Sequence, residues 1–159
     1  MPEISVKEIY DISRTALVQH GALDWVAGDV ASAIAASESV GNKICGLYYL
    51  ESYCEQLISG RVDGRASPEI QLVRTGSVYV NAKDGFAQPA FSKGLPEALK
   101  VARENGIASL SVGRAHTCTS LGYFTKKIAE SGFLGLGLTN ASPIVAPPGG
   151  KSRIIGTNP

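Results

Sequence analysis

The hydrophobic pattern of this chain changes between Gly60 and Pro68, and this change constrains the fold more than any single motif does. Before this stretch, apolar residues recur at helical spacing, and after it short apolar runs alternate with helical stretches. We therefore expect a helical segment over residues 1–64 and a mixed strand and helix region over residues 65–159. This order predicts an α/β fold of the α+β kind.

The first segment is predicted to contain helices only. The first helix begins at Ser5, whose hydroxyl can accept a hydrogen bond from the Glu8 amide in a capping box, and it ends at Gly21. The second helix is expected over residues 24–40, where alanines would allow another helix to approach closely. The third is expected over residues 44–59, so three helices in succession precede the change in pattern.

The second region alternates between the two kinds of element. β-branched and other apolar runs predict strands, and longer stretches with helical spacing predict helices. The expected strands cover residues 70–73, 78–80, 107–112 and 133–138, and the expected helices cover residues 94–105 and 121–131.

Composition excludes several classes of protein. Formal charges nearly balance at +1 without a run of like charge, so we expect no nucleic-acid partner and no acidic membrane surface. No apolar stretch is long enough to span a bilayer, and the opening residues lack the pattern of a signal peptide. The three cysteines, Cys45, Cys54 and Cys118, lack the spacing of a zinc site or a disulfide framework. We therefore expect a soluble, cytoplasmic protein without a metal.

His116 is the first candidate for chemistry, because it lies between a predicted strand and a predicted helix, where side chains commonly face a cleft. An imidazole can move a proton near neutral pH, which an alcohol requires as a hydride leaves its carbon. The alternative is a structural histidine that caps the helix or makes a hydrogen bond. His20, the other histidine, is expected at the end of the first helix, and we assign it no chemistry.

Two nucleotide-binding motifs are excluded by their spacing. The tail contains Gly150-Lys151-Ser152, but the first glycine of a P-loop is missing because position 145 is Val145. No GxGxxG motif follows a strand, since Gly135-Leu136-Gly137 lies inside a predicted strand and no helix-opening glycine follows it. A conventional Rossmann fingerprint is therefore absent.

Cys45, Tyr49 and Tyr53 recur every four residues, which places them on one face of the predicted third helix. A thiol and two phenols could line a pocket there. Packing in the core is the alternative for such a stripe, and composition alone favours it.

The order of several stretches resembles the malate/L-lactate dehydrogenase family, which is NAD(P)-dependent without a Rossmann fold. This family includes ureidoglycolate dehydrogenase and the cyclic imino-acid reductases. The similar stretches are the opening helices, residues 106–116 with His116, residues 131–143, and residues 145–159 with the signature Gly156-Thr157-Asn158-Pro159. Together they cover essentially the whole chain, which resembles the N-terminal half of a family member.

The resemblance implies an oxidoreductase that transfers a hydride between NAD or NADP and a 2-oxo or 2-hydroxy acid, or a related imine. His116 would be the proton donor or acceptor. Tyr53 matches a tyrosine near the substrate in relatives, and we group Cys45 and Tyr49 with it as the expected substrate-binding residues. Residues 65–159 would hold the cofactor through Thr139, Asn140, Ala141, Gly156, Thr157 and Asn158. A homodimer, or a second chain that completes the fold, is also implied.

The chain departs from the family's usual pattern in three places. Ile44-Cys45-Gly46 stands where relatives usually carry Ser-His-Gly, and Ala141 stands where a serine is usual. Tyr49 replaces an arginine suited to clamping a carboxylate. Either the substrate is not a simple malate or lactate, or another group, such as Arg114, binds its carboxylate.

The length of the chain also departs from the family, whose members are about twice as long. The chain ends where the Gly-Thr-Asn-Pro signature is complete, which would leave apolar faces uncovered. A truncated gene, a split enzyme that needs a second chain, and a proteolytic product are all open. A catalytically silent remnant that acts as an interaction module is the alternative to an active enzyme.

Overall fold

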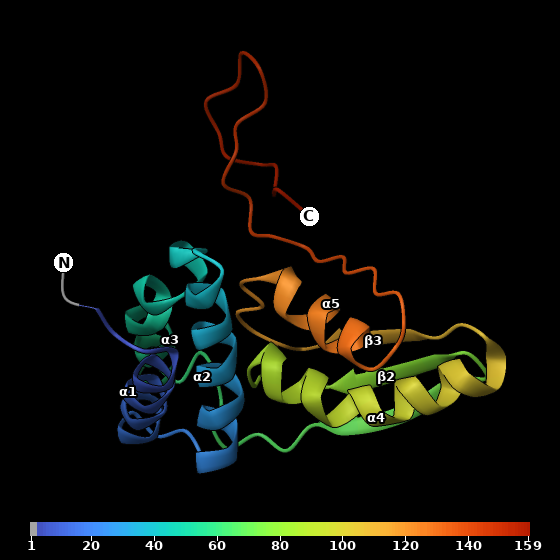
Figure 1. Cartoon of the computed structure of the whole chain (residues 1–159). Coiled ribbons are helices and arrows are strands. Elements are labelled where there is room, and N and C mark those ends of the chain that lie inside the picture. The colour runs from blue at the N-terminus through green and yellow to red at the C-terminus, as the bar shows by residue number, and fades with distance from the viewer. Residues whose placement is uncertain (1–2) are drawn as a thin grey trace.

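The computed structural model describes residues 3–159, so the first two residues of the predicted helical segment lie outside the described part. Helices α1 (Val6–Gln19), α2 (Asp24–Ser39) and α3 (Leu50–Ile58) lie together at one end of the molecule (Figure 1). A three-stranded sheet lies at the other end with helices α4 and α5, and the C-terminal tail extends away from both parts. The predicted α/β class is confirmed.

Helices α1 and α2 form as the sequence predicts. The Ser5 hydroxyl accepts a hydrogen bond from the Glu8 amide at 3.2 Å, and the Glu8 carboxylate accepts one from the Ser5 amide at 2.8 Å. Gly21 follows α1 with a φ of +103°, a conformation that side chains disfavour. The apolar faces of α1 and α2 meet α3 in one core, whose members include Ile9, Leu17, Val26, Val30, Ile34, Tyr53 and Phe86.

The helix predicted over residues 44–59 is wrong in its first part. Two 3-10 turns, Lys43–Cys45 and Leu47–Tyr49, precede α3. The backbone between them is bent at Gly46, which has a ψ of −136° instead of a helical value. Cys45 therefore does not lie on the same helix as Tyr53, and the predicted common face is not present.

The Glu38 side chain explains this break in the helix. Its carboxylate accepts a hydrogen bond from the Leu47 amide at 2.8 Å. A Cβ atom at Gly46 would lie only 2.2 Å from Oε1 of Glu38, so a side chain there would displace the carboxylate. A contact between positions eight residues apart thus ends the local helical pattern.

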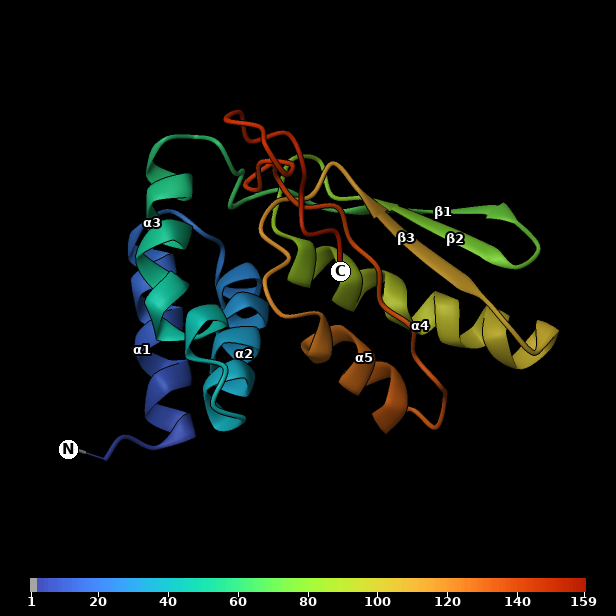
Figure 2. The same cartoon turned by 90° about the horizontal axis from the view of Figure 1, so that it is seen from above.

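The sheet has the order β1-β2-β3. Strands β1 (Glu69–Arg74) and β2 (Ser77–Asn81) form an antiparallel hairpin, as predicted. Strand β3 (Ser109–Gly113) pairs parallel to β2, and helix α4 (Ala87–Asn105) makes the crossover between them (Figure 2). Parallel neighbours bring the carboxyl ends of β2 and β3 to the same edge of the sheet, where His116 follows.

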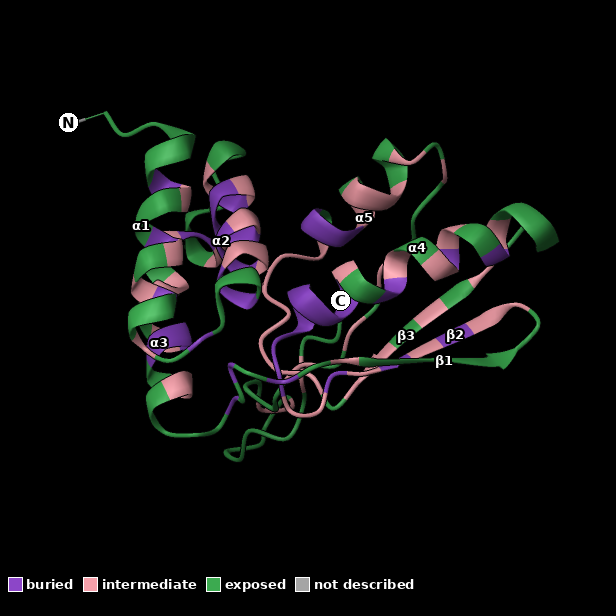
Figure 3. Ribbon diagram, turned by 90° about the horizontal axis from the view of Figure 1, so that it is seen from below, coloured by how far each residue is buried: buried purple, intermediate pink, exposed green. Residues whose placement is uncertain are grey.

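Helix α4 covers one face of the sheet, and β1 is exposed along its whole length (Figure 3). Val78 and Val80 of β2 are fully buried beneath α4. At the closest approach, a Cβ atom at Gly94 would lie 2.4 Å from Cγ2 of Val80 and 2.9 Å from Cδ1 of Leu110. The helix begins at Ala87, earlier than the predicted residue 94, and it contains both Gly94 and Pro96.

Helix α5 (Leu121–Glu130) joins the two parts of the molecule. Its Tyr123 and Phe124 are buried with Phe91 of α4 and Ala33 of α2. The Phe91 and Phe124 rings meet edge to face, with centroids 4.9 Å apart. No helix in the part of the chain that the structure describes is long and apolar enough to cross a membrane.

The strand predicted over residues 133–138 is wrong, because this segment pairs with no strand among residues 3–159. Its glycines lie against α5: a Cβ atom at Gly135 would lie 3.1 Å from Cβ of Ile128, and one at Gly137 would lie 3.1 Å from Cγ2 of Thr125. The alternate residues are exposed, namely Leu134, Leu136 and Leu138. The alternation that predicted a strand reflects this contact with a helix.

We predict that Gly94→Ala destabilises the fold by about 1–3 kcal/mol, because the added methyl group overpacks the contact between α4 and the sheet. Urea unfolding followed by circular dichroism measures the effect. Gly122→Ala is the matched control, since the nearest atom to its Cβ is 3.6 Å away, and it should be neutral or stabilising by up to about 1 kcal/mol. Equal loss in both variants would contradict the packing argument.

Candidate functional site

His116 lies where the loops that follow β2 and β3 run side by side. Backbone hydrogen bonds of 2.8–3.0 Å join these loops, with the donor given first: Ala82 to Gly113, Asp84 to Arg114, His116 to Gly85, and Ala87 to His116. The pairing of β2 with β3 thus continues beyond the strands and holds the His116 backbone against the start of α4.

The His116 side chain is half-buried and makes no hydrogen bond to any other residue of the described range 3–159. No residue in this range is therefore a partner for His116 in a capping or hydrogen-bonded structural role. Both ring nitrogens are therefore available to a ligand or to water, as proton transfer to a substrate requires.

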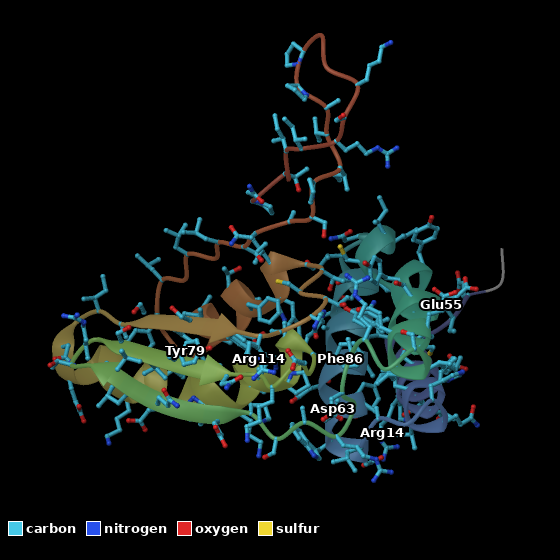
Figure 4. All side chains as sticks on the ribbon, turned by 180° about the vertical axis from the view of Figure 1, so that it is seen from behind. Arg14, Glu55, Asp63, Tyr79, Phe86 and Arg114 are labelled. Carbon is cyan, nitrogen blue, oxygen red and sulfur yellow. The ribbon has the colours of Figure 1, made fainter. Side chains whose placement is uncertain are left out.

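Arg114 is engaged by a carboxylate of the neighbouring loop. Its guanidinium donates from Nε to Oδ1 of Asp84 at 3.3 Å and from Nη2 to Oδ2 of the same residue. This pairing raises the pKa of Arg114. Figure 4 shows Arg114 between Tyr79, in the middle of β2, and Phe86, which precedes α4. Nε and Nη2 of Arg114 are therefore occupied by Asp84, and the assignment of Arg114 to a carboxylate ligand stays a prediction.

Tyr53 connects the helical end of the molecule to the loop that carries His116. Its side chain is 0% exposed, and its hydroxyl lies 3.0 Å from Oγ1 of Thr119. Nε2 of Gln88, also fully buried in the first turn of α4, donates to the Tyr53 hydroxyl at 3.1 Å. The Tyr53 ring packs edge to face on Phe86, with centroids 5.3 Å apart.

The loop that carries His116 has a strained backbone. Arg114, Thr117 and Thr119 have φ values of +50°, +59° and +52°, which cost on the order of 1–3 kcal/mol each for residues with side chains. Neighbouring side chains hold this conformation: Nε2 of Gln88 donates to the Thr117 carbonyl at 2.9 Å, and the Thr117 hydroxyl donates to Oε1 of Gln56. Such strain is concentrated at functional sites.

The expected substrate-binding residues are only partly brought together. The Tyr49 ring meets Tyr53 edge to face, with centroids 5.4 Å apart. Cys45, on its own 3-10 turn, lies close enough to Cys118 to influence its thiol electrostatically. Tyr53 itself reaches the loop only through its hydroxyl. The assignment of these residues to the substrate stays a prediction.

Cys118 is unsuited to nucleophilic catalysis. Burial raises the pKa of its thiol, the side chain of Thr139 opposes this shift, and Cys45 adds to it. A thiol with a raised pKa stays protonated at neutral pH, and the thiolate is the reactive form.

The expected cofactor-binding residues meet in the C-terminal tail. The Thr139 amide donates to the Pro159 carbonyl at 2.8 Å, and the Ala141 amide donates to Oδ1 of Asn158 at 2.7 Å. A Cβ atom at Gly156 would lie 2.3 Å from the Ala141 carbonyl oxygen, so only glycine allows this approach. Two segments distant in the sequence thus form one cluster.

The chemistry of this cluster fits a nicotinamide. Asn140 and Thr157 are exposed, and their amide and hydroxyl groups can both donate to and accept from a carboxamide. Thr139 lies beside Cys118, so the cluster adjoins the loop that carries His116. Within residues 3–159, no group of three or more His, Cys, Asp or Glu side chains is placed to hold a metal ion.

Sequence reasoning missed Gln56, Gln88 and Thr119. A signal for Gln88 was available, because it is the polar residue within the apolar run Phe86-Ala87-Gln88-Pro89-Ala90-Phe91. A buried amide must find partners, so an isolated glutamine in such a run indicates a buried hydrogen-bond network. Nothing in the sequence indicates that Thr119 lies against Tyr53.

The chain belongs to the malate/L-lactate dehydrogenase family, which it matches over residues 4–159. It is 33% identical to the (2R)-3-sulfolactate dehydrogenase (NADP(+)) of Chromohalobacter salexigens, over 98% of this chain and 46% of that protein. It is 29% identical to the ureidoglycolate dehydrogenase (NAD(+)) of Escherichia coli, over 99% of this chain and 45% of that protein. The family resemblance is thereby confirmed.

A solved structure has the same fold. The chain superposes on the delta1-piperideine-2-carboxylate reductase from Pseudomonas syringae pvar. tomato with a TM-score of 0.88 and 30% sequence identity. The match covers 99% of this chain and 48% of that chain. The chain spans about half the length of the curated relatives it matches.

We predict that Cys118 reacts slowly with iodoacetamide at pH 7, and that the rate continues to rise with pH above the ordinary thiol range. The sign follows from the raised pKa, since a smaller fraction of thiolate exists at a given pH. Mass spectrometry of the alkylated peptide measures the rate, and the urea-unfolded chain is the reference. A folded chain that reacts as fast as the unfolded one would contradict the burial of this thiol.

We also predict that Gly156→Ala opens the cluster in the tail, because its Cβ would collide with the Ala141 carbonyl. Hydrogen exchange of the Thr139 and Ala141 amides should speed up by about tenfold, as expected for opening that becomes easier by about 1.4 kcal/mol. Gly76→Ala is the control, since its nearest atom would be 3.8 Å away, and it should leave these amides protected.

Proposed function

We propose that this chain carries the proton-transfer and nicotinamide-binding part of an NAD(P)-dependent oxidoreductase. The substrate class is a 2-oxo acid or a related cyclic imine, reduced to the 2-hydroxy acid or the amine. The observation that carries the proposal is the His116 imidazole, left without a partner in residues 3–159, on a loop whose Cys118 lies beside Thr139 of the tail cluster.

The relatives support this choice of reaction class. They are named as dehydrogenases of sulfolactate and ureidoglycolate and as a reductase of a cyclic imine carboxylate, which share a carboxylate beside the reacting carbon. One is named for NADP(+) and another for NAD(+), so we propose either nucleotide as the cofactor.

The reduced cofactor, when bound, supplies a hydride to the carbonyl or imine carbon. In the same step, protonated His116 donates its proton to the carbonyl oxygen or imine nitrogen, which neutralises the developing negative charge. His116 is then a neutral imidazole and regains its proton from solvent. In the reverse direction, neutral His116 accepts the proton of the alcohol. Because its backbone is hydrogen-bonded to Gly85 and Ala87, the main chain of His116 keeps one position from which the ring reaches the substrate.

We predict that His116→Ala lowers kcat/KM for 2-oxo acid reduction by about 10²–10⁴-fold, the usual contribution of a positioned acid or base. Nicotinamide absorbance at 340 nm measures turnover with pyruvate, glyoxylate and Δ1-piperideine-2-carboxylate. NADH and NADPH affinities, measured by fluorescence titration, should change by less than about twofold, because the ring supplies a proton and not nucleotide binding.

His20→Ala is the matched control, because the other histidine bonds only to the Ala16 carbonyl at the end of α1. Turnover unchanged by His116→Ala would refute the proton role. A wild-type chain that binds neither nucleotide would refute the larger proposal.

A second candidate function is an interaction module without catalytic activity. The exposed row of Leu134, Leu136 and Leu138 favours it, since this extended segment has apolar side chains that no described residue covers. A second copy of the chain, or a separate chain that completes the fold, would cover the row. Size-exclusion chromatography of the wild type and of Leu136→Glu tests this: the variant should elute later if the row lies in an interface.

A further inference from the structure

We infer that Thr119 is a specificity-determining residue whose hydroxyl donates a hydrogen bond to the substrate carboxylate, with Gln88 and Tyr53 as the positioning residues that direct it. The inference deepens the function proposed above and rests on it. It stands on the chain of hydrogen bonds from Gln88 through Tyr53 to Thr119.

The orientation of the Gln88 amide sets the direction of this chain. Its Nε2 lies 2.9 Å from the Thr117 carbonyl oxygen and 3.4 Å from that of Cys118. Carbonyl oxygens only accept, so the NH₂ group, and not Oε1, must face them. One hydrogen of Nε2 serves these carbonyls, and the other is donated to the Tyr53 hydroxyl.

The Tyr53 hydroxyl must then be the donor in its hydrogen bond with Thr119. The Tyr53 oxygen accepts from Gln88, and its side chain is fully buried, so its hydrogen has to find an acceptor inside the protein. Oγ1 of Thr119, at 3.0 Å, is that acceptor. If Thr119 were the donor instead, the hydroxyl hydrogen of Tyr53 would be buried without an acceptor. Burial also raises the pKa of Tyr53, so the hydroxyl keeps this hydrogen throughout the working pH range.

The hydrogen of Thr119 remains unused by the chain. Its oxygen accepts from Tyr53, and no other described residue accepts from its hydroxyl. Thr119 is half-buried, so this hydrogen is accessible to a ligand. The left-handed backbone of Thr119, with a φ of +52°, has a conformational cost that a ligand-binding role would justify.

A carboxylate is the ligand that this donor fits best. Thr119 follows His116 by three residues on one loop, so a group beside the reacting carbon comes near both. The neighbouring guanidinium of Arg114 is already paired with Asp84. An O–H donor to a carboxylate makes a short, charge-assisted hydrogen bond, which a neutral acceptor does not.

The test uses oxamate, a non-reducible analogue of a 2-oxo acid, titrated calorimetrically into the whole chain with NADH present. Thr119→Val keeps the side-chain shape and removes the hydroxyl, so the affinity for oxamate should fall by about 10–100-fold. Thr119→Ser should restore the affinity to within about threefold of the wild type, because it restores the donor. Tyr53→Phe should weaken oxamate by about 3–10-fold, since Thr119 loses the partner that directs it.

Two controls separate ligand binding from structural damage. NADH affinity should stay within about twofold in every variant, because a merely structural role for Thr119 would weaken both ligands. Thr125→Val, a threonine of α5 that bonds only to backbone carbonyls, should leave oxamate binding unchanged. A test that needs no variant is the NMR signal of the Thr119 side chain, which should shift when oxamate saturates the wild type.

The outcomes distinguish the two proposals. Oxamate binding that is unchanged in Thr119→Val, or Thr119 signals that do not shift on saturation, would overturn the role of Thr119 and leave the proposed function standing. A wild-type chain that binds NADH but not oxamate would overturn the 2-oxo acid assignment, and the role of Thr119 with it.

Discussion

The parallel pairing of β2 and β3, continued beyond the strands by the loop bonds from Ala82 to His116, is the constraint on which the site depends. These hydrogen bonds use the backbone, so they place His116 whatever the neighbouring side chains are. They also bring the loop that carries His116 to the first turn of α4, where the Gln88 amide donates to the Thr117 carbonyl. There Gln88 and Gln56 bind Thr117 and hold the left-handed backbone of the loop.

Local signals predicted the elements whose ends are set by neighbours in the sequence. The Ser5 capping box and the turn before Ser77 act within a few residues, and both were correct. The failures came from distant contacts. Glu38 interrupts the predicted third helix at Gly46. Helix α5 packs against the glycines of residues 133–138, an alternating segment that would otherwise suit a sheet. Periodicity alone does not distinguish either contact from the element that was predicted in its place.

For the site, the family motifs led to His116 and to the segments of the tail that meet at Gly156. They led there because each motif is a run of neighbouring residues, which can be read without any long-range contact. The network of Tyr53, Gln88 and Thr119 joins three separate elements through side chains, so its geometry exists only in the folded chain. Tyr53 was expected beside the substrate; its hydroxyl lies against Thr119, and the substrate role stays a prediction.

Helix α4 makes two separate contacts along its length. Gln88, at its start, orients the loop that carries His116, and Gly94, less than two turns further on, fits against Val80 in the sheet. A change that tilts the helix on the sheet therefore also moves the amide at its start. Packing in the sheet core and the position of the Gln88 amide are therefore mechanically coupled, so residues far from the loop that carries His116 influence how that loop is held.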